Sequence, residues 1–283
     1  MATASSAPAS PSGLPPSGPL TYRGYLRLAE LLAAQVPVVR PPARDELAFI
    51  VTHQTYELWF KLLLADLELV RDEMFAGRPA AASRVFERIH VVGRVLLEQL
   101  AVLEFMTPAD FAEFRDALAP ASGLQSAQFR ELEFLSGREA PDPPERACAG
   151  LGPEERDAVL RRLAEPSVWD GFRHLLGEPD AGGRGAGEAV GEDSLPATLA
   201  RVAAGQEPGT GELRRLAAHL YAYDEEVVAW RTRHADLAAR LIGDAPGTGG
   251  TSGVDYLRRT ARRRFYPLLH DLFGACPAHR GRR

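Results

Sequence analysis

Cysteine is scarce in this chain of 283 residues, which contains only Cys148 and Cys276. Neither lies in a C-x-x-C or zinc-binding pattern, which excludes a disulfide-stabilised scaffold and a cysteine-based metal site. We therefore expect free thiols and a reducing, cytoplasmic environment. Lysine is scarcer still, because Lys61 is the only one and arginine supplies almost all of the positive charge.

Long hydrophobic runs and an excess of positive charge are also missing. No stretch of about 20 apolar residues exists, so we expect no transmembrane helix, and the N-terminus lacks the pattern of a signal peptide. The net charge is −5 and the isoelectric point is near 5.9. This balance gives no general attraction to nucleic acid or to an anionic membrane, so neither is expected as a partner.

Apolar residues recur at steps of three and four, and no segment alternates as a β-strand does. The pattern predicts an all-α helical bundle, preceded by a disordered Ala/Ser/Pro/Gly-rich tail over residues 1–19. Residues 20–283 are expected to form one helical domain, in which the Gly/Pro-rich region 137–212 leaves the core as a variable, partly mobile excursion. The predicted helices cover residues 20–35, 44–75, 80–105, 108–120, 126–135, 153–164, 167–176, 212–242 and 254–273.

Two of the seven histidines, His53 and His234, lie on apolar faces of long predicted helices. One interpretation is a core histidine whose ring is hydrogen-bonded to the protein. The other is a ligand of haem iron or another metal, since neutral imidazole binds both. The sequence contains no H-E-x-x-H motif and no His/Asp/Glu cluster at the spacing of a mononuclear metal site.

Arg115 and the glycine-rich segment 247–253 are further candidates for binding. An arginine beside an apolar helix face suits a bidentate grip on a carboxylate, although a surface salt bridge to a neighbouring acidic residue explains Arg115 equally well. The segment 247–253 lacks the ending of a P-loop and follows a predicted helix, so it is either a linker or a loop that offers N–H groups to a small anion.

Several segments together resemble the tryptophan 2,3-dioxygenase family, and they occur in that family's order. The resemblance covers about residues 20–135 and 212–273. The matching segments are Leu-Thr-Tyr-Arg-Gly-Tyr-Leu at 20–26, Phe-Ile-Val-Thr-His-Gln-Thr-Tyr-Glu-Leu-Trp-Phe-Lys at 49–61, Phe-Arg-Asp at 114–116, Pro-Ala-Ser-Gly-Leu-Gln-Ser at 120–126, Trp-Arg-Thr-Arg-His at 230–234 and Gly-Thr-Gly-Gly-Thr-Ser-Gly at 247–253.

The resemblance implies a helical homotetramer that binds haem b between its helices. His234 would be the proximal iron ligand, and His53 would lie on the distal side near the indole N–H of the substrate. The other site residues that the resemblance implies are Phe49 against the substrate ring, Arg115 at its carboxylate, Thr248 at its amino-acid end, Ser122 near the haem and distal histidine, and Tyr22, Tyr25 and Leu26 reaching into a neighbouring subunit's pocket.

The function implied is oxidation of L-tryptophan by O2 to N-formylkynurenine, the opening step of tryptophan catabolism by the kynurenine pathway. Departures from the family pattern occur at Arg44, where histidine is usual, at Leu124 and at Thr251. They leave open a haem mono-oxygenase of the same family that converts a tryptophan derivative to an oxindole-type product. A non-catalytic haem-binding sensor is the third possibility, although a sensor has no need of an amino-acid site.

Overall fold

The computed structural model describes residues 19–139, 144–177, 195–205, 210–249 and 252–273. The described part of the chain contains helices and no β-strand, which confirms the all-α prediction. The tail predicted over residues 1–19, apart from Pro19, and both Cys276 and Thr251 lie outside the described residues. None of the described helices is long and apolar enough to cross a membrane.

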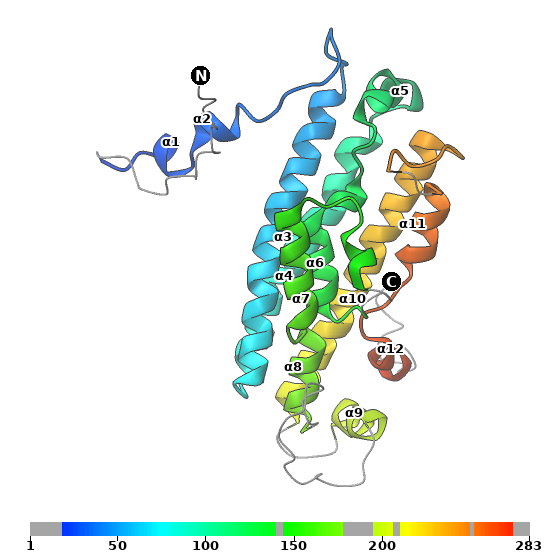
Figure 1. Cartoon of the computed structure of the whole chain (residues 1–283). Coiled ribbons are helices and arrows are strands. Elements are labelled where there is room, and N and C mark those ends of the chain that lie inside the picture. The colour runs from blue at the N-terminus through cyan, green and yellow to red at the C-terminus, as the bar shows by residue number, and fades with distance from the viewer. Residues whose placement is uncertain (1–18, 140–143, 178–194, 206–209, 250–251, 274–283) are drawn as a thin grey trace, which may run out of the picture.

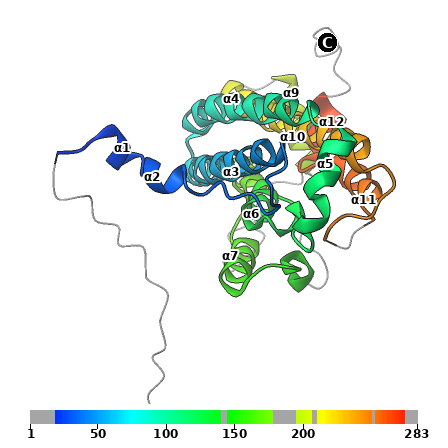
Figure 2. The same cartoon turned by 90° about the horizontal axis from the view of Figure 1, so that it is seen from above.

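Four helices that lie side by side form the bundle: α3 (Glu46–Phe75), α4 (Pro79–Glu104), α6 (Ala127–Ser136) and α10 (Gly211–Ile242) (Figures 1 and 2). Their apolar stripes face one another, as residues at three- and four-residue steps share one helix face. Among the side chains removed from solvent are Leu67, Phe86, Leu100 and Leu220. The core therefore runs the length of the bundle.

Shorter helices close the ends and sides of the bundle. They are α5 (Pro108–Arg115), α7 (Pro153–Ala164), α8 (Val168–Leu175), α9 (Leu195–Ala204), α11 (Val254–Ala261) and α12 (Pro267–Phe273), with 3₁₀ turns η1 (Asp116–Leu118), η2 (Gly123–Gln125) and η3 (Pro144–Cys148). The predicted start of α5 is confirmed: the Thr107 hydroxyl caps the N–H of Asp110 in a capping box, and Pro108 occupies the first turn.

Two segments predicted as single helices are each broken in two. Residues 20–35 form α1 (Tyr22–Tyr25) and α2 (Leu28–Leu31), separated by Arg27 at a φ of 50°. No residue of either helix is buried, so packing does not hold them in one straight helix. Residues 254–273 break between α11 and α12, where the buried Asp224 carboxylate accepts the backbone N–H groups of Phe265 and Tyr266.

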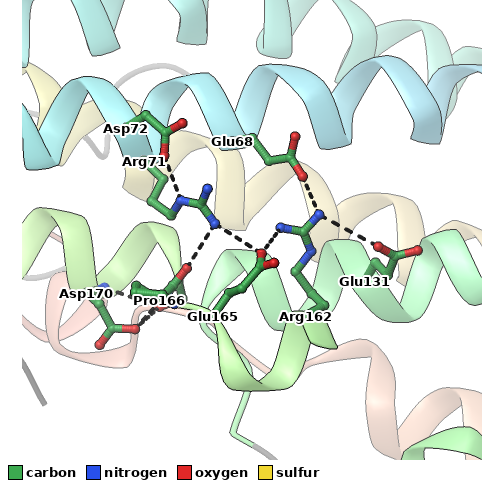
Figure 3. A network of polar contacts seen from close by, with 9 residues as sticks. Glu68, Arg71, Asp72, Glu131, Arg162, Glu165, Pro166 and Asp170 are labelled. Carbon is green, nitrogen blue, oxygen red and sulfur yellow. Dashed lines mark hydrogen bonds and ion pairs between the residues drawn. The ribbon is translucent and has the colours of Figure 1, made fainter. Parts of the chain in front are cut away.

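The region 137–212, predicted to leave the core, contributes helices that pack on it. Val168 and Phe172 of α8 are fully buried within the main core cluster, as is nearly all of Leu199 of α9. Figure 3 shows polar contacts between α3 and the segment that includes α7: the Arg162 guanidinium of α7 pairs with Glu68 of α3, and Arg71 of α3 bonds the Pro166 carbonyl, between α7 and α8, at 3.4 Å. The described part of this region is therefore integral to the bundle.

Candidate active site

A mainly apolar cavity of about 320 Å³ lies between α3, α4, α5, α6, α10 and α11. Its walls bring together six of the predicted site residues, which come from five separate segments of the sequence. They are Phe49, His53, Arg115, Ser122, His234 and Thr248. Tyr56, Phe60, Phe129 and Trp230 add aromatic surface, so the cavity suits a large, flat, apolar ligand.

His53 lies on α3 with its ring turned toward the cavity. Its Nδ1 atom is 2.7 Å from the carbonyl oxygen of Phe49, one turn earlier. Since a carbonyl only accepts, Nδ1–H donates, and this bond fixes the neutral tautomer with Nε2 unprotonated. Burial lowers the pKa of His53 below its ordinary value, which favours that neutral form. The Phe49 ring lies 4.1 Å from the imidazole, centroid to centroid, and continues the apolar wall.

His234 lies on α10, and its imidazole makes no hydrogen bond with any described residue. The ring stacks almost parallel to Trp230, with centroids 5.6 Å apart and planes inclined by 5°. Burial, with a smaller contribution from His53, lowers the pKa of His234 to about 4. The side chain is therefore a neutral imidazole with no hydrogen-bond partner among the described residues, and a neutral imidazole is the form in which histidine binds a metal.

The mouth of the cavity is formed where the loop after α10 meets the segment after α5. Arg115 Nη2 donates to the carbonyl of Pro246 at 2.6 Å, and the Thr248 hydroxyl donates to the carbonyl of Ala121 at 2.6 Å. Gly249 comes so close to Ser122 that an added Cβ would lie 2.6 Å from the serine Cβ. Glycine at 249 is therefore required for this close approach.

Arg115 also has an acidic neighbour, as its Nη1 atom lies 3.6 Å from Asp116 Oδ1. The carboxylate of Asp116 is 96% exposed, so solvent screens this pair strongly. The guanidinium itself is only 22% exposed and lines the cavity. Ser122 has a structural contact of its own, since its hydroxyl accepts the backbone N–H of Leu124 at 3.3 Å and caps η2.

The inner end of the cavity carries a buried ionic cluster that sequence analysis did not single out. Glu133 of α6 accepts from Arg231 at 2.7 Å, lies 3.3 Å from Arg130 and also pairs with Arg138. Arg231 also donates to the Arg263 carbonyl at 3.1 Å and lies 5.0 Å above the Phe265 ring. Arg231 lies three residues before His234 in the Trp-Arg-Thr-Arg-His segment, and this position could have marked it as a residue of the cavity. Nothing in the local sequence distinguishes Glu133.

Tyr22, Tyr25 and Leu26 are not brought to the cavity of their own chain. Their exposed fractions are 77%, 71% and 39%, and α1 and α2 stand away from the bundle (Figures 1 and 2). No group of three or more His, Cys, Asp or Glu side chains in the described part of the chain is arranged to hold a metal ion.

Comparison with known proteins agrees with this geometry. The model of the family described as tryptophan 2,3-dioxygenase matches residues 11–142 and 195–276. Among curated relatives, the tryptophan 2,3-dioxygenase of a Nocardioides species is 45% identical over 257 residues, which are 89% of this chain and 93% of that protein. The enzyme of that name from Anaeromyxobacter dehalogenans is 40% identical over 91% of this chain and 95% of its own length. The chain therefore belongs to the tryptophan 2,3-dioxygenase family.

Proposed function

We propose that this protein is a haem-dependent dioxygenase that converts L-tryptophan and O2 to N-formylkynurenine. The observation that carries the proposal is the meeting of two neutral imidazoles, His53 and His234, in one apolar cavity whose mouth holds Arg115 and Thr248. The names of the relatives support both the substrate and the two-oxygen outcome.

The residues of the cavity fit haem b. His234 would supply the axial nitrogen, because its imidazole is neutral and has no hydrogen-bond partner among the described residues. The aromatic walls formed by Phe60, Phe129 and Trp230 suit the apolar face of a porphyrin. Bound there, haem would supply the iron chemistry that activates O2, which no amino-acid side chain provides.

The chain's own contribution is to bind and orient tryptophan. Arg115 offers two parallel N–H donors to the substrate carboxylate, and the Thr248 hydroxyl can both donate and accept at the amino-acid end. Phe49 would pack on the indole ring. The unprotonated Nε2 atom of His53 would accept a hydrogen bond from the indole N–H, which orients the C2–C3 bond without abstracting a proton. Ser122 would contact the haem and the distal histidine.

The two alternatives are less well supported. A mono-oxygenase acting on a tryptophan derivative would use the same cavity, but the relatives compared are named as dioxygenases. A haem-binding sensor would leave Arg115 and Thr248 at the cavity mouth without a role. We therefore assign the chain to tryptophan catabolism by the kynurenine pathway; its cytoplasmic location stays a prediction from its cysteine content.

The test of this function is incubation of the reduced, haem-loaded protein with L-tryptophan and O2, followed by mass spectrometry. The expected product is heavier than tryptophan by two oxygen atoms, and both should derive from ¹⁸O2 when that gas is used. A product with one added oxygen would instead support the mono-oxygenase. The absence of any product would support the remaining alternative, a non-catalytic haem-binding sensor.

The haem ligand has a separate test. His234→Ala should abolish the normal haem spectrum, because the axial nitrogen is removed. His53→Ala should keep the haem and show weakened activity, because a distal hydrogen-bonding residue orients substrate but does not hold iron. His219→Ala is a control on the same helix outside the cavity. Unchanged axial ligation in His234→Ala, or loss of haem in His53→Ala, would show that the two roles are assigned wrongly.

A further inference from the structure

A second, smaller cavity lies inside the four-helix bundle, beneath the proposed active site. Its volume is about 40 Å³, more than the roughly 30 Å³ that one water molecule occupies in the liquid. The wall is almost entirely hydrocarbon and draws on α3, α4, α6 and α10. Its apolar side chains include Leu63, Ile89, Leu96, Leu132, Val227 and Phe265.

The polar groups in this wall are already engaged by the protein. Glu133 is held by arginines, as described above, and the Tyr223 hydroxyl is 2.9 Å from the Ser136 hydroxyl. Glu226 accepts from His90, whose Nδ1 atom is 3.0 Å away. The side chain of Trp230 interacts with that of Tyr56. A stable buried water needs two to four polar partners, so this mainly hydrocarbon wall favours a small apolar occupant over water.

The two cavities share a wall. Phe60, Phe129, Glu133 and Trp230 line both of them. The three aromatic rings form a mutual cluster, with centroids 5.6 Å apart for Phe60 and Phe129, 5.4 Å for Phe129 and Trp230, and 6.3 Å for Phe60 and Trp230. Only side chains therefore lie between the small cavity and the large one, and in the haem-loaded protein the same three rings would border the porphyrin. Side-chain motions are among the fastest motions of a protein, so they give a gas molecule a route out of the small cavity.

We propose that the small cavity is a docking site for a small apolar gas, and that it supplies O2 to the neighbouring active site. O2 is too weak a hydrogen-bond acceptor to be held by polar groups, whereas a close-fitting hydrocarbon wall attracts it by dispersion. This role rests on the proposed function, because only an enzyme that consumes O2 makes such a store useful. The presence of a gas site does not depend on that function.

Xenon is the probe for the site, because it is an apolar atom that enters dry protein cavities. A crystal of the haem-loaded protein under xenon pressure should show xenon among Leu63, Ile89 and Val227. Val227→Ala should increase its occupancy, because the cavity is enlarged. Val227→Phe should remove it, because the larger side chain fills the space. Val228→Phe is the matched control, since Val228 is the next residue of α10 and lines neither cavity.

Steady-state kinetics test the supply of O2. Val227→Phe should raise the KM for O2 threefold or more, while the KM for tryptophan, the kcat at saturating O2 and the haem spectrum stay as in the wild type. Val228→Phe should leave all four values unchanged. If Val227→Phe does not fold, the xenon occupancy of Val227→Ala, compared with that of the wild type, still shows whether the small cavity binds gas.

Three results would overturn the proposal. Absence of xenon from the wild-type cavity, or ordered water there that xenon does not displace, would show that no gas site exists. Loss of xenon in Val227→Phe with an unchanged KM for O2 would show that the site does not supply the reaction. If tryptophan is not oxidised at all, the proposed function fails, and the xenon occupancy still decides whether the cavity binds gas.

Discussion

At the scale of single residues, burial sets the chemistry of the cavity histidines. His53 donates through Nδ1 to a backbone carbonyl, whereas the His234 ring stacks on Trp230 and has no hydrogen-bond partner among the described residues. In both, removal from water disfavours the imidazolium and lowers the pKa. Their different surroundings support the different roles proposed for them, with His234 as the iron ligand and His53 as a hydrogen-bonding partner of the substrate.

The shifted pKa of His234 predicts that acid destabilises the haem-free protein. An unfolded histidine titrates near pH 6.5, whereas the pKa of His234 in the fold is about 4. Between these values the unfolded chain binds a proton that the folded chain does not, so the free energy of unfolding falls as the pH falls. From pH 7 to pH 4 this group should remove up to about 3 kcal/mol.

Urea unfolding at a series of pH values measures this effect. Other groups titrate in the same range, so the informative quantity is the difference between the wild type and His234→Gln, which has no titrating ring at this position. The variant should lose less stability than the wild type between pH 6.5 and pH 4. Equal losses would contradict a depressed pKa at His234.

Arg115 should not be replaceable by lysine. Arg115→Lys is expected to weaken tryptophan binding about tenfold, or about 1.4 kcal/mol, because an ammonium cannot meet both carboxylate oxygens in a planar fork. The haem spectrum should be retained. Titration of the wild type and of Arg115→Lys with tryptophan and with tryptamine tests whether the carboxylate contact is responsible, since tryptamine lacks the carboxylate. Tryptamine should bind the wild type weakly and lose little more in the variant. Equal binding of the two ligands by the wild type would refute the carboxylate contact.

At the scale of elements, ion pairs attach α7 to α3 and α6 of the bundle. The Arg162 guanidinium is 10% exposed and lies among the carboxylates of Glu68, Glu131 and Glu165 (Figure 3). Glu131 is half-buried, and the pKa of its carboxyl is raised because burial disfavours the charged form. Arg162 is shared by all three carboxylates, whereas Arg71 pairs with Glu165 alone among them, at 3.4 Å.

Arg162→Ala should destabilise the protein by about 1–3 kcal/mol, because it leaves partly buried carboxylates without their shared cation. Arg78→Ala is the matched control, since Arg78 forms an exposed pair with Glu73, and such pairs contribute little. Urea unfolding of both variants measures the contrast. If Arg162→Ala is no more destabilised than Arg78→Ala, the cluster does not hold α7 in place.

At the scale of the whole molecule, the N-terminal segment suggests assembly into a larger unit. Tyr22 and Tyr25 are largely exposed, and α1 and α2 contribute no buried residue (Figure 1). Exposed aromatic side chains beyond the bundle favour burial against another subunit. The family resemblance implies a homotetramer, and we propose that Tyr22, Tyr25 and Leu26 reach a neighbouring subunit's cavity in that assembly.

Light scattering on the purified, haem-loaded protein should give the mass of a tetramer. The double variant Tyr22→Ala, Tyr25→Ala should bind tryptophan more weakly, because it removes aromatic surface from the neighbouring subunit's site. Leu69→Ala, an exposed apolar position on the surface of α3, serves as the control. A monomeric wild type with full activity would disprove the arrangement.

The sequence by itself determined the long helical elements and gave a set of candidate site residues. Periodicity located α3, α4 and α10 to within two residues at each end, because each is long and has a continuous apolar stripe. It failed at Arg27 and between α11 and α12, since the first break has no apolar pattern to mark it and the second depends on Asp224, about forty residues earlier. The resemblance to a family named His53, His234, Arg115 and Thr248 before any geometry was known.

Only the tertiary structure decided how these residues are arranged in space around one cavity. It placed α8 in the core, brought Thr248 and Arg115 to one cavity mouth, and set Gly249 against Ser122. Glu133 and the small cavity around Val227 have no local sequence signal, because each is defined by side chains from several helices. Periodicity records which face of a helix is buried, but the partner across that face, and the space left between them, are fixed only when the helices pack.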